Sequence, residues 1–256
     1  MSWQIFVHSV RQVFGNLEGA LRVSAVLTIA QIVVTLTLGR ALLADQATLQ
    51  TMMLEGNFDW AGYAITTLVL VLSGLWIAVG WHRYVLTNEQ PGFVPKLRFD
   101  RMMGYFGKSI LIGLLIVPVA MVTGLIAGLV LVPLLGDAMV SQPVLAMVLF
   151  GLLVYLPAGI VAMRLSAALP GVALQAGVSV FAGWKATEGQ TGTIVGVVLI
   201  SIVGSGLLML PTLFVFVPMS LPALIWQFVM QWVMVMVGVS ILTTLYGHYV
   251  EGRPLV

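Results

Sequence analysis

The sequence contains no cysteine and very few charged residues. Its 256 residues include 11 Lys and Arg and 9 Asp and Glu, so that only 8% of the chain is charged. A soluble domain carries about 25% charged residues. The missing cysteines exclude a disulfide scaffold, and the low charge excludes both a disordered chain and a nucleic-acid binder with a basic face. A water-facing surface cannot be built from so little charge.

Apolar residues take the place of the missing charge. They make up 60% of the chain, and the mean hydropathy is +1.09. One polytopic membrane domain over residues 1–256 accounts for this composition. The apolar runs lack the alternation of barrel strands and are long enough to cross the bilayer as helices, which predicts an all-α integral membrane fold. The six expected spans are approximately 20–39, 61–82, 109–135, 143–168, 191–217 and 223–247.

The basic residues predict the orientation of these spans. With a cytoplasmic N-terminus, ten of the eleven Lys and Arg residues lie in cytoplasmic segments, and Arg40 alone lies outside. Because positive residues accumulate on the cytoplasmic side, both termini are expected there, with Gln46 and Asp137 outside and Lys96 and Lys185 inside.

Three amphipathic stretches precede the helices that run outward, at residues 3–14, 99–106 and 178–188. Each is followed by a glycine, which suggests three copies of a unit made of an interfacial helix and a transmembrane hairpin. The other interpretation is that any six-helix protein with basic cytoplasmic segments looks periodic. Residues 169–188 are too polar for a seventh span, so this segment is predicted to be a helix lying along the cytoplasmic surface.

One segment carries a resemblance to a known family. A helix ending in an Arg is followed by a Leu-x-x-Pro step and then by a Trp-x-x-Thr-x-Gly sequence, and the matching residues are Arg164, Pro170, Trp184, Thr187 and Gly189. This pattern resembles the six-helix membrane domain of glycerophosphoryl diester phosphodiesterase-type proteins and of related small bacterial inner-membrane proteins. The resemblance implies a six-helix fold, and it implies that the chain lies in a bacterial cytoplasmic (inner) membrane. It implies no phosphodiesterase activity, since the soluble catalytic domain is not in this chain.

The candidates for chemistry within the spans are few. No Asp, Glu, Lys or His lies in the middle of a span, and no nucleophile elbow, phosphate-binding loop or zinc-helix motif occurs, so no catalytic residue and no cofactor is expected. Gln31, Gln227 and Gln231 are polar residues within spans, and interhelical hydrogen bonding is their expected role. Gln227 and Gln231 share one helix face, which leaves a polar lining open as an alternative.

Histidines provide the only metal candidates in the sequence. His8, His82 and His248 all lie near the predicted cytoplasmic interface, where three imidazoles could meet on one metal ion. Interfacial amphipathic histidine is the simpler interpretation, and no metal is expected.

Small residues and basic residues mark two further surfaces. Small residues at four-residue spacing form two rows that permit close approach of helices, either within the chain or against another membrane protein. One row is Ala120, Gly124 and Gly128, and the other is Gly192 and Gly196. The residues expected on anionic lipid headgroups are Lys96, Arg98, Arg101, Lys108 and Trp184.

Together these features favour a non-catalytic accessory or scaffold protein that associates with membrane lipids and with other integral membrane proteins, and not with nucleic acid. The alternative is a transporter or lipid-handling membrane protein, and a weaker one is an enzyme at the cytoplasmic interface. A polar cavity within the membrane favours the transporter or lipid-handling alternative. The oligomeric state stays open.

Overall fold

The structure, a computed structural model, describes residues 1–136, 141–175, 177–217 and 220–255. All regular structure in these ranges is helical, which confirms the all-α class, and six helices are long and apolar enough to cross a membrane. Asp137 lies outside the described residues. The helices are α1 (Ser2–Phe14), α2 (Leu17–Thr37), α3 (Arg40–Leu43), α4 (Gln46–Leu54), α5 (Trp60–Thr87), α6 (Phe99–Leu135), α8 (Pro143–Ser166), α9 (Leu169–Leu174), α10 (Phe181–Ala186), α11 (Thr191–Phe214) and α12 (Leu221–Tyr249).

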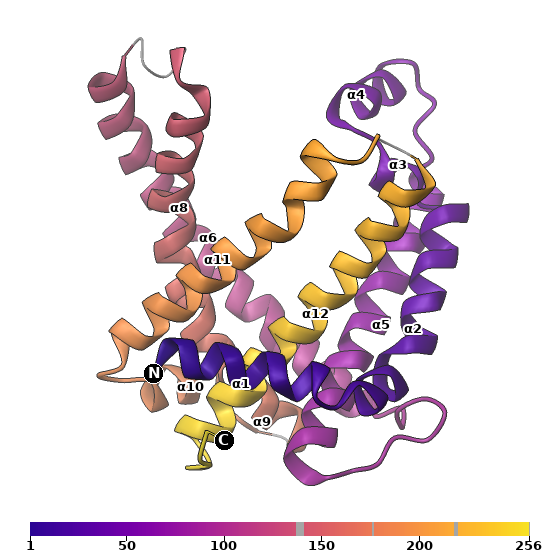
Figure 1. Ribbon diagram of the computed structural model, residues 1–256, viewed down its shortest axis with the longest axis vertical. Helices are drawn as coiled ribbons and strands as arrows, with labels where there is room; N and C mark the ends of the chain where they lie inside the picture. Colours follow the sequence, from indigo (N-terminus) through magenta and orange to yellow (C-terminus); the bar gives the residue numbers. More distant parts are fainter. Residues whose placement is uncertain (137–140, 176, 218–219, 256) are drawn as a thin grey trace.

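Three helical hairpins, α2 with α5, α6 with α8, and α11 with α12, form the bundle (Figure 1). They converge at the end that holds α1, α9, α10 and both chain termini, which we call the base. They spread apart toward the opposite end, the top, where α3 and α4 lie. The α6–α8 hairpin leans farthest from the others, so its upper half has few neighbours within the chain.

Helix α1 lies across the base under α11 and α12, as its amphipathic pattern requires (Figure 1). Its buried residues are Ile5, Ser9 and Val13, at four-residue spacing. The Ser9 hydroxyl donates to the Ile5 carbonyl and lies 2.9 Å from Thr244 Oγ1 of α12. These contacts fix α1 to the bundle through one apolar face.

Helix α6 begins earlier than the sequence pattern suggests. The sequence predicts a separate amphipathic stretch at residues 99–106, before Gly107, but these residues are the first two turns of a continuous 37-residue helix. Met102 and Tyr105 are buried there, and this packing outweighs the cost of about 1 kcal/mol for a glycine within a helix.

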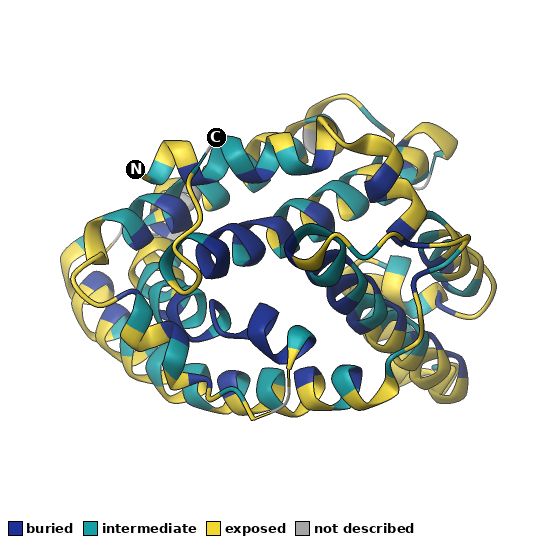
Figure 2. Cartoon of the chain, turned by 90° about the horizontal axis from the view of Figure 1, so that it is seen from below, coloured by how far each residue is buried: buried dark blue, intermediate teal, exposed yellow. Residues whose placement is uncertain are grey.

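The predicted surface helix over residues 169–188 is wrong in its first half. The segment forms two short helices, α9 and α10, and Leu169 through Ala173 of α9 are all buried. Viewed from below, α9 is the short dark-blue helix in the centre of the base (Figure 2). Pro170 lies in its first turn, and Gly171 lies so close to Tyr246 that a Cβ there would be 2.8 Å from the ring. Small apolar residues let this segment enter the core.

Helix α10 packs on α8 through Gly183. A Cβ at this position would collide with the Arg164 carbonyl oxygen and lie 2.7 Å from the Ala168 nitrogen. Because both atoms belong to the backbone, no side-chain rotation can relieve the collision.

We therefore expect Gly183→Ala to lower the free energy of unfolding by roughly 2 to 3 kcal/mol. Gly192→Ala is the matched control, since nothing lies within 4 Å of a Cβ there and alanine favours the helix. Thermal unfolding in mild detergent measures both variants. Equal stability of the two variants would contradict the close packing of α10 on α8.

Candidate functional site

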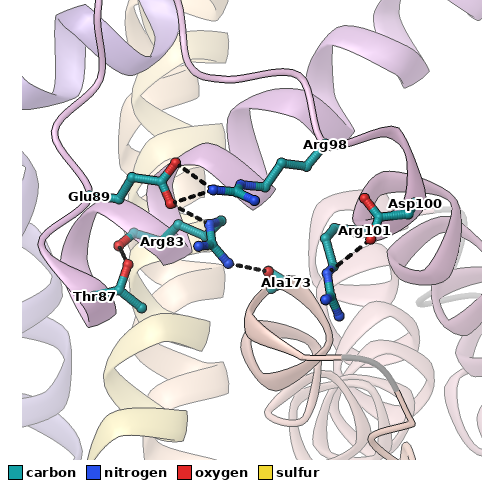
Figure 3. Close-up of polar contacts among 7 residues, drawn as sticks. All are labelled: Arg83, Thr87, Glu89, Arg98, Asp100, Arg101 and Ala173. Atoms are coloured by element: carbon teal, nitrogen blue, oxygen red, sulfur yellow. Dashed lines mark hydrogen bonds and ion pairs between the residues drawn. The ribbon is translucent and has the colours of Figure 1, made fainter.

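The base of the bundle contains a cluster of basic residues around the end of α9 (Figure 3). Arg83, from the last part of α5, points its Nη1 at the Ala173 carbonyl oxygen at a distance of 3.3 Å. The last carbonyls of a helix have no partner within the helix, and a buried one needs a donor from elsewhere. Arg83 supplies that donor.

Glu89 connects this arginine to the start of α6. Its Oε2 accepts from Arg83 Nε at 2.7 Å, and both of its oxygens accept from Arg98 Nη2 at 3.0 Å (Figure 3). The loop that carries Glu89 is also held by Trp76, whose indole nitrogen donates to the Pro95 carbonyl at 3.0 Å. Burial raises the pKa of the Glu89 carboxyl, but hydrogen bonds and charge from Arg98 and Arg83 outweigh it and hold this pKa below its ordinary value.

Arg101 occupies the next turn of α6 and is less completely paired. Its Nε lies 3.1 Å from Asp100 Oδ2, and the Asp100 side chain is mostly exposed. The buried Nη1 of Arg101 has no hydrogen-bond partner among the described residues. A guanidinium has five N–H donors in a fixed plane, and the donors on Nη1 are left without an acceptor among the described residues.

A pocket of about 170 Å³, which we call the basic pocket, lies beside Arg101. Arg101, Gly104 and Lys108 lie on one face of α6 at spacings of three and four residues. Gly104 keeps the space between the two cations open, and α9 closes the pocket through Val172. The lining residues are Asp100, Arg101, Gly104, Lys108, Val172, Gly177 and Val178.

The charge of this region favours an anion. Residues 83–108 contain five cations and two carboxylates, and one of these carboxylates, Glu89, is already shared by two arginines. An arginine plane and a lysine ammonium are the donors that proteins use for phosphate groups. The basic pocket can therefore bind a phosphate-sized anion next to the apolar side chains of Val172 and Val178.

The predicted headgroup residues fall into four places. Arg101 and Lys108 meet in the basic pocket, Arg98 is paired with Glu89, and Lys96 lines a small depression beside Arg83 and Glu89. Trp184 makes a different contact, since the Arg164 guanidinium lies 4.9 Å from the centre of its indole ring. The ion pair between Arg83 and Glu89 was not predicted from the sequence. A single carboxylate in a loop among basic residues could have indicated such a pair.

The three histidines belong to separate contacts. His82 is fully buried, with Nδ1 2.8 Å from Thr243 Oγ1 and Nε2 3.2 Å from Tyr105 Oη. His8 lies 2.9 Å from the Gln12 amide nitrogen, and His248 lies 3.0 Å from the Arg253 carbonyl. In the part of the chain that is described, no three His, Cys, Asp or Glu residues are grouped to hold a metal.

The small-residue rows lie partly on contacts within the chain. A Cβ on Gly124 would be 3.9 Å from Val154 of α8, and one on Gly196 would be 2.7 Å from Cβ of Ser2 in α1. Nothing lies within 4 Å of the corresponding position at Gly128 or Gly192, and Ala120 is half-buried. Gly196 thus permits close approach of α1 to α11, whereas a Cβ on Gly124 would make only an ordinary van der Waals contact with α8.

Comparisons of the sequence with protein-family models and with curated proteins, and of the chain with solved structures, found no match. The resemblance of residues 163–189 to phosphodiesterase-type membrane domains stays a prediction.

The Glu89 pairs predict a pH dependence of stability. Because the pKa of Glu89 is lower in the folded chain than its ordinary value of 4.5, its contribution is complete above pH 4.5 and is lost as the pH falls through the folded-state pKa. The free energy of unfolding of the wild-type protein should exceed that of Glu89→Gln by roughly 1 to 2 kcal/mol at pH 7. This difference should vanish in acid. Detergent unfolding curves between pH 3 and 7 measure it, and a constant difference would contradict the pairing.

Proposed function

We propose that this chain is a non-catalytic multi-pass protein of the bacterial cytoplasmic membrane that binds anionic lipid at its base. The observation that carries the proposal is the buried Nη1 of Arg101, unpaired among the described residues, in a pocket that also holds Lys108. A lipid phosphate would accept from both groups, and its acyl chains would lie along apolar side chains such as Val178.

The distribution of charge supports a cytoplasmic position for the base. Ten of the eleven basic residues are in α1 or α2, near the ends of spans at the base, or in the segments that join them there, while Arg40 begins α3 at the top. By the positive-inside rule, this distribution supports a cytoplasmic position for the base and both termini. In this position the basic pocket lies at the level of anionic headgroups.

A second cavity supports lipid handling. An apolar groove of about 510 Å³ runs between α1, α11 and α12. Gly204 and Gly238 lie on its walls, and Phe6 and Val10 of α1 line the side toward the base. Its size and its apolar lining suit an acyl chain better than a polar solute.

The test is the affinity for phosphatidylglycerol of the purified protein in neutral detergent, titrated by native mass spectrometry. Arg101→Gln should weaken binding roughly tenfold, because a charge-assisted hydrogen bond to phosphate is lost. Arg11→Gln is the matched control, since it removes the same charge from an exposed position on α1 at the base. An equal effect of both substitutions would mean that only net charge matters, and the proposed pocket would be rejected.

The scaffold role predicted from the sequence is the second candidate function. The α6–α8 hairpin favours this role. Only 11% of the residues in an 18-residue apolar stretch of α6 are buried within the chain, compared with 39% for α5. The exposed apolar face of α6 includes Leu125 and Leu129. In a membrane this face contacts lipid or the helices of another protein.

A photocrosslinking amino acid at Leu129 distinguishes these two neighbours in intact cells. If the hairpin docks on a partner, position 129 gives an adduct of one discrete protein mass. The same crosslinker at Ile29 of α2, which has a similar exposure, should give none. Lipid adducts alone at both positions would remove the support for a scaffold.

A further inference from the structure

A polar recess lies within the membrane-spanning part of the bundle, between α2 and α12 and above α1. Its polar lining comprises Thr28, Gln31 and Thr35 of α2 and Gln227 and Gln231 of α12, and its volume is about 170 Å³. Buried Ile77 and Met236 lie at its inner wall. Because most of these residues belong to helices long enough to span the membrane, the recess is surrounded by the bilayer and not by water.

The depth of the two α12 glutamines follows from helix geometry. Helix α12 begins at Leu221, and each residue adds 1.5 Å, so Gln227 lies about 9 Å and Gln231 about 15 Å below the top of the helix. Gln231 is thus well inside the hydrocarbon layer. An amide without hydrogen bonds at this depth is costly, by several kcal/mol on transfer scales.

These two amides have no partner within the described chain. Gln31 donates to Ser73 Oγ at 2.7 Å, which accounts for its amide nitrogen. Gln227 and Gln231 are exposed on the same helix face and make no hydrogen bond with any described residue. Each carries two N–H donors and a carbonyl acceptor, so whatever occupies the recess must both donate and accept hydrogen bonds.

The rest of the lining restricts the occupant further. Among the described residues no charged side chain lines the recess, and the remaining walls are apolar, with Ile32, Leu70 and Phe228 among them. A charged ligand would have no counter-ion there. The occupant is therefore neutral, carries hydroxyl and carbonyl groups, and has an apolar part that remains in the bilayer.

We infer that the polar recess binds the glycerol portion of a neutral lipid of the diacylglycerol class. The free hydroxyl donates to a glutamine carbonyl, and the ester carbonyls accept from the amide nitrogens of Gln227 and Gln231. The acyl chains extend into the bilayer from the exposed side of α12. This site differs from the basic pocket in depth, in charge and in the helices that form it.

The test uses a diacylglycerol with a diazirine near the glycerol, added to the full-length protein in phosphatidylcholine nanodiscs. After illumination, the adducts should map to peptides covering residues 28–43 and 221–236, and unlabelled diacylglycerol should compete. A triacylglycerol with the same diazirine lacks the hydroxyl and should label the recess far less. Equal labelling by the two probes, or labelling that does not saturate, would overturn the proposal.

The double substitution Gln227→Leu with Gln231→Leu removes both amides and keeps the helix-forming, apolar character of α12. Labelling should fall roughly tenfold, in keeping with the loss of two hydrogen bonds. Gln50→Leu on α4, outside the recess, is the matched control and should label like wild type. Unchanged labelling of the double variant would overturn the proposal. If that variant does not fold, competition by unlabelled diacylglycerol on the wild-type protein is the test, and a lack of competition would overturn the proposal.

Two further variants separate the polar recess from a dimer interface and from the basic pocket. The chain has no cysteine, so Gln231→Cys reports directly on a second copy. A disulfide-linked dimer in the membrane would show that the face pairs with itself and would overturn the lipid assignment. Arg101→Gln should leave diacylglycerol labelling unchanged, so failure of the basic pocket and failure of the recess are distinguishable.

Discussion

The buried carbonyl end of α9 is the constraint on which the base of this protein depends. A six-residue helix cannot satisfy all of its last carbonyls internally, and Ala173, whose carbonyl is one of them, is fully buried. Arg83 provides the donor, and its charge is compensated by Glu89. Since Glu89 also binds Arg98, the same interaction fixes the start of α6. The position of Arg101 and Lys108 follows from that register.

The arrangement of the hairpins explains why candidate sites occur at two depths. All three hairpins are held together at the base by α1 and α9, where buried side chains and ion pairs concentrate. Toward the top they separate, and polar groups such as Gln227 and Gln231 line a recess beside α2 without a hydrogen bond to its described residues. The proposed anion site therefore lies at the base, and the proposed neutral-lipid site lies in the upper part of the span.

Much of the fold could be predicted from hydropathy and charge. The six spans and the amphipathic α1 follow from apolar length and helical periodicity, both of which are local properties. The burial of α9 could not be predicted in this way, because Leu169 through Leu174 are as apolar as a segment that enters the bilayer surface. Only the contact with Tyr246 and the capping by Arg83 distinguish a core helix from an interfacial one. These contacts join residues far apart in sequence.

The candidate site was predictable only in part for the same reason. The basic residues at 96–108 indicated an anionic surface, but one of them, Arg98, is neutralised by Glu89, and Trp184 pairs with Arg164. The loop that carries Glu89 determines that Arg98 has a carboxylate on its Nη2, whereas Nη1 of Arg101 has no partner among the described residues. Likewise, Gln227 and Gln231 could be placed on one face from their spacing, whereas their lack of a partner among the described residues depends on the separation of α2 and α12.

Hydrogen–deuterium exchange in nanodiscs tests most directly whether buried α9 builds an anionic-lipid site. The amides of α9 should exchange much more slowly than those of α10 in every bilayer, because α9 is enclosed and α10 lies at the edge of the base. Adding phosphatidylglycerol to phosphatidylcholine should slow exchange further in residues 100–108 and 172–178. Rapid exchange of α9, or identical exchange of these segments in both bilayers, would contradict this arrangement.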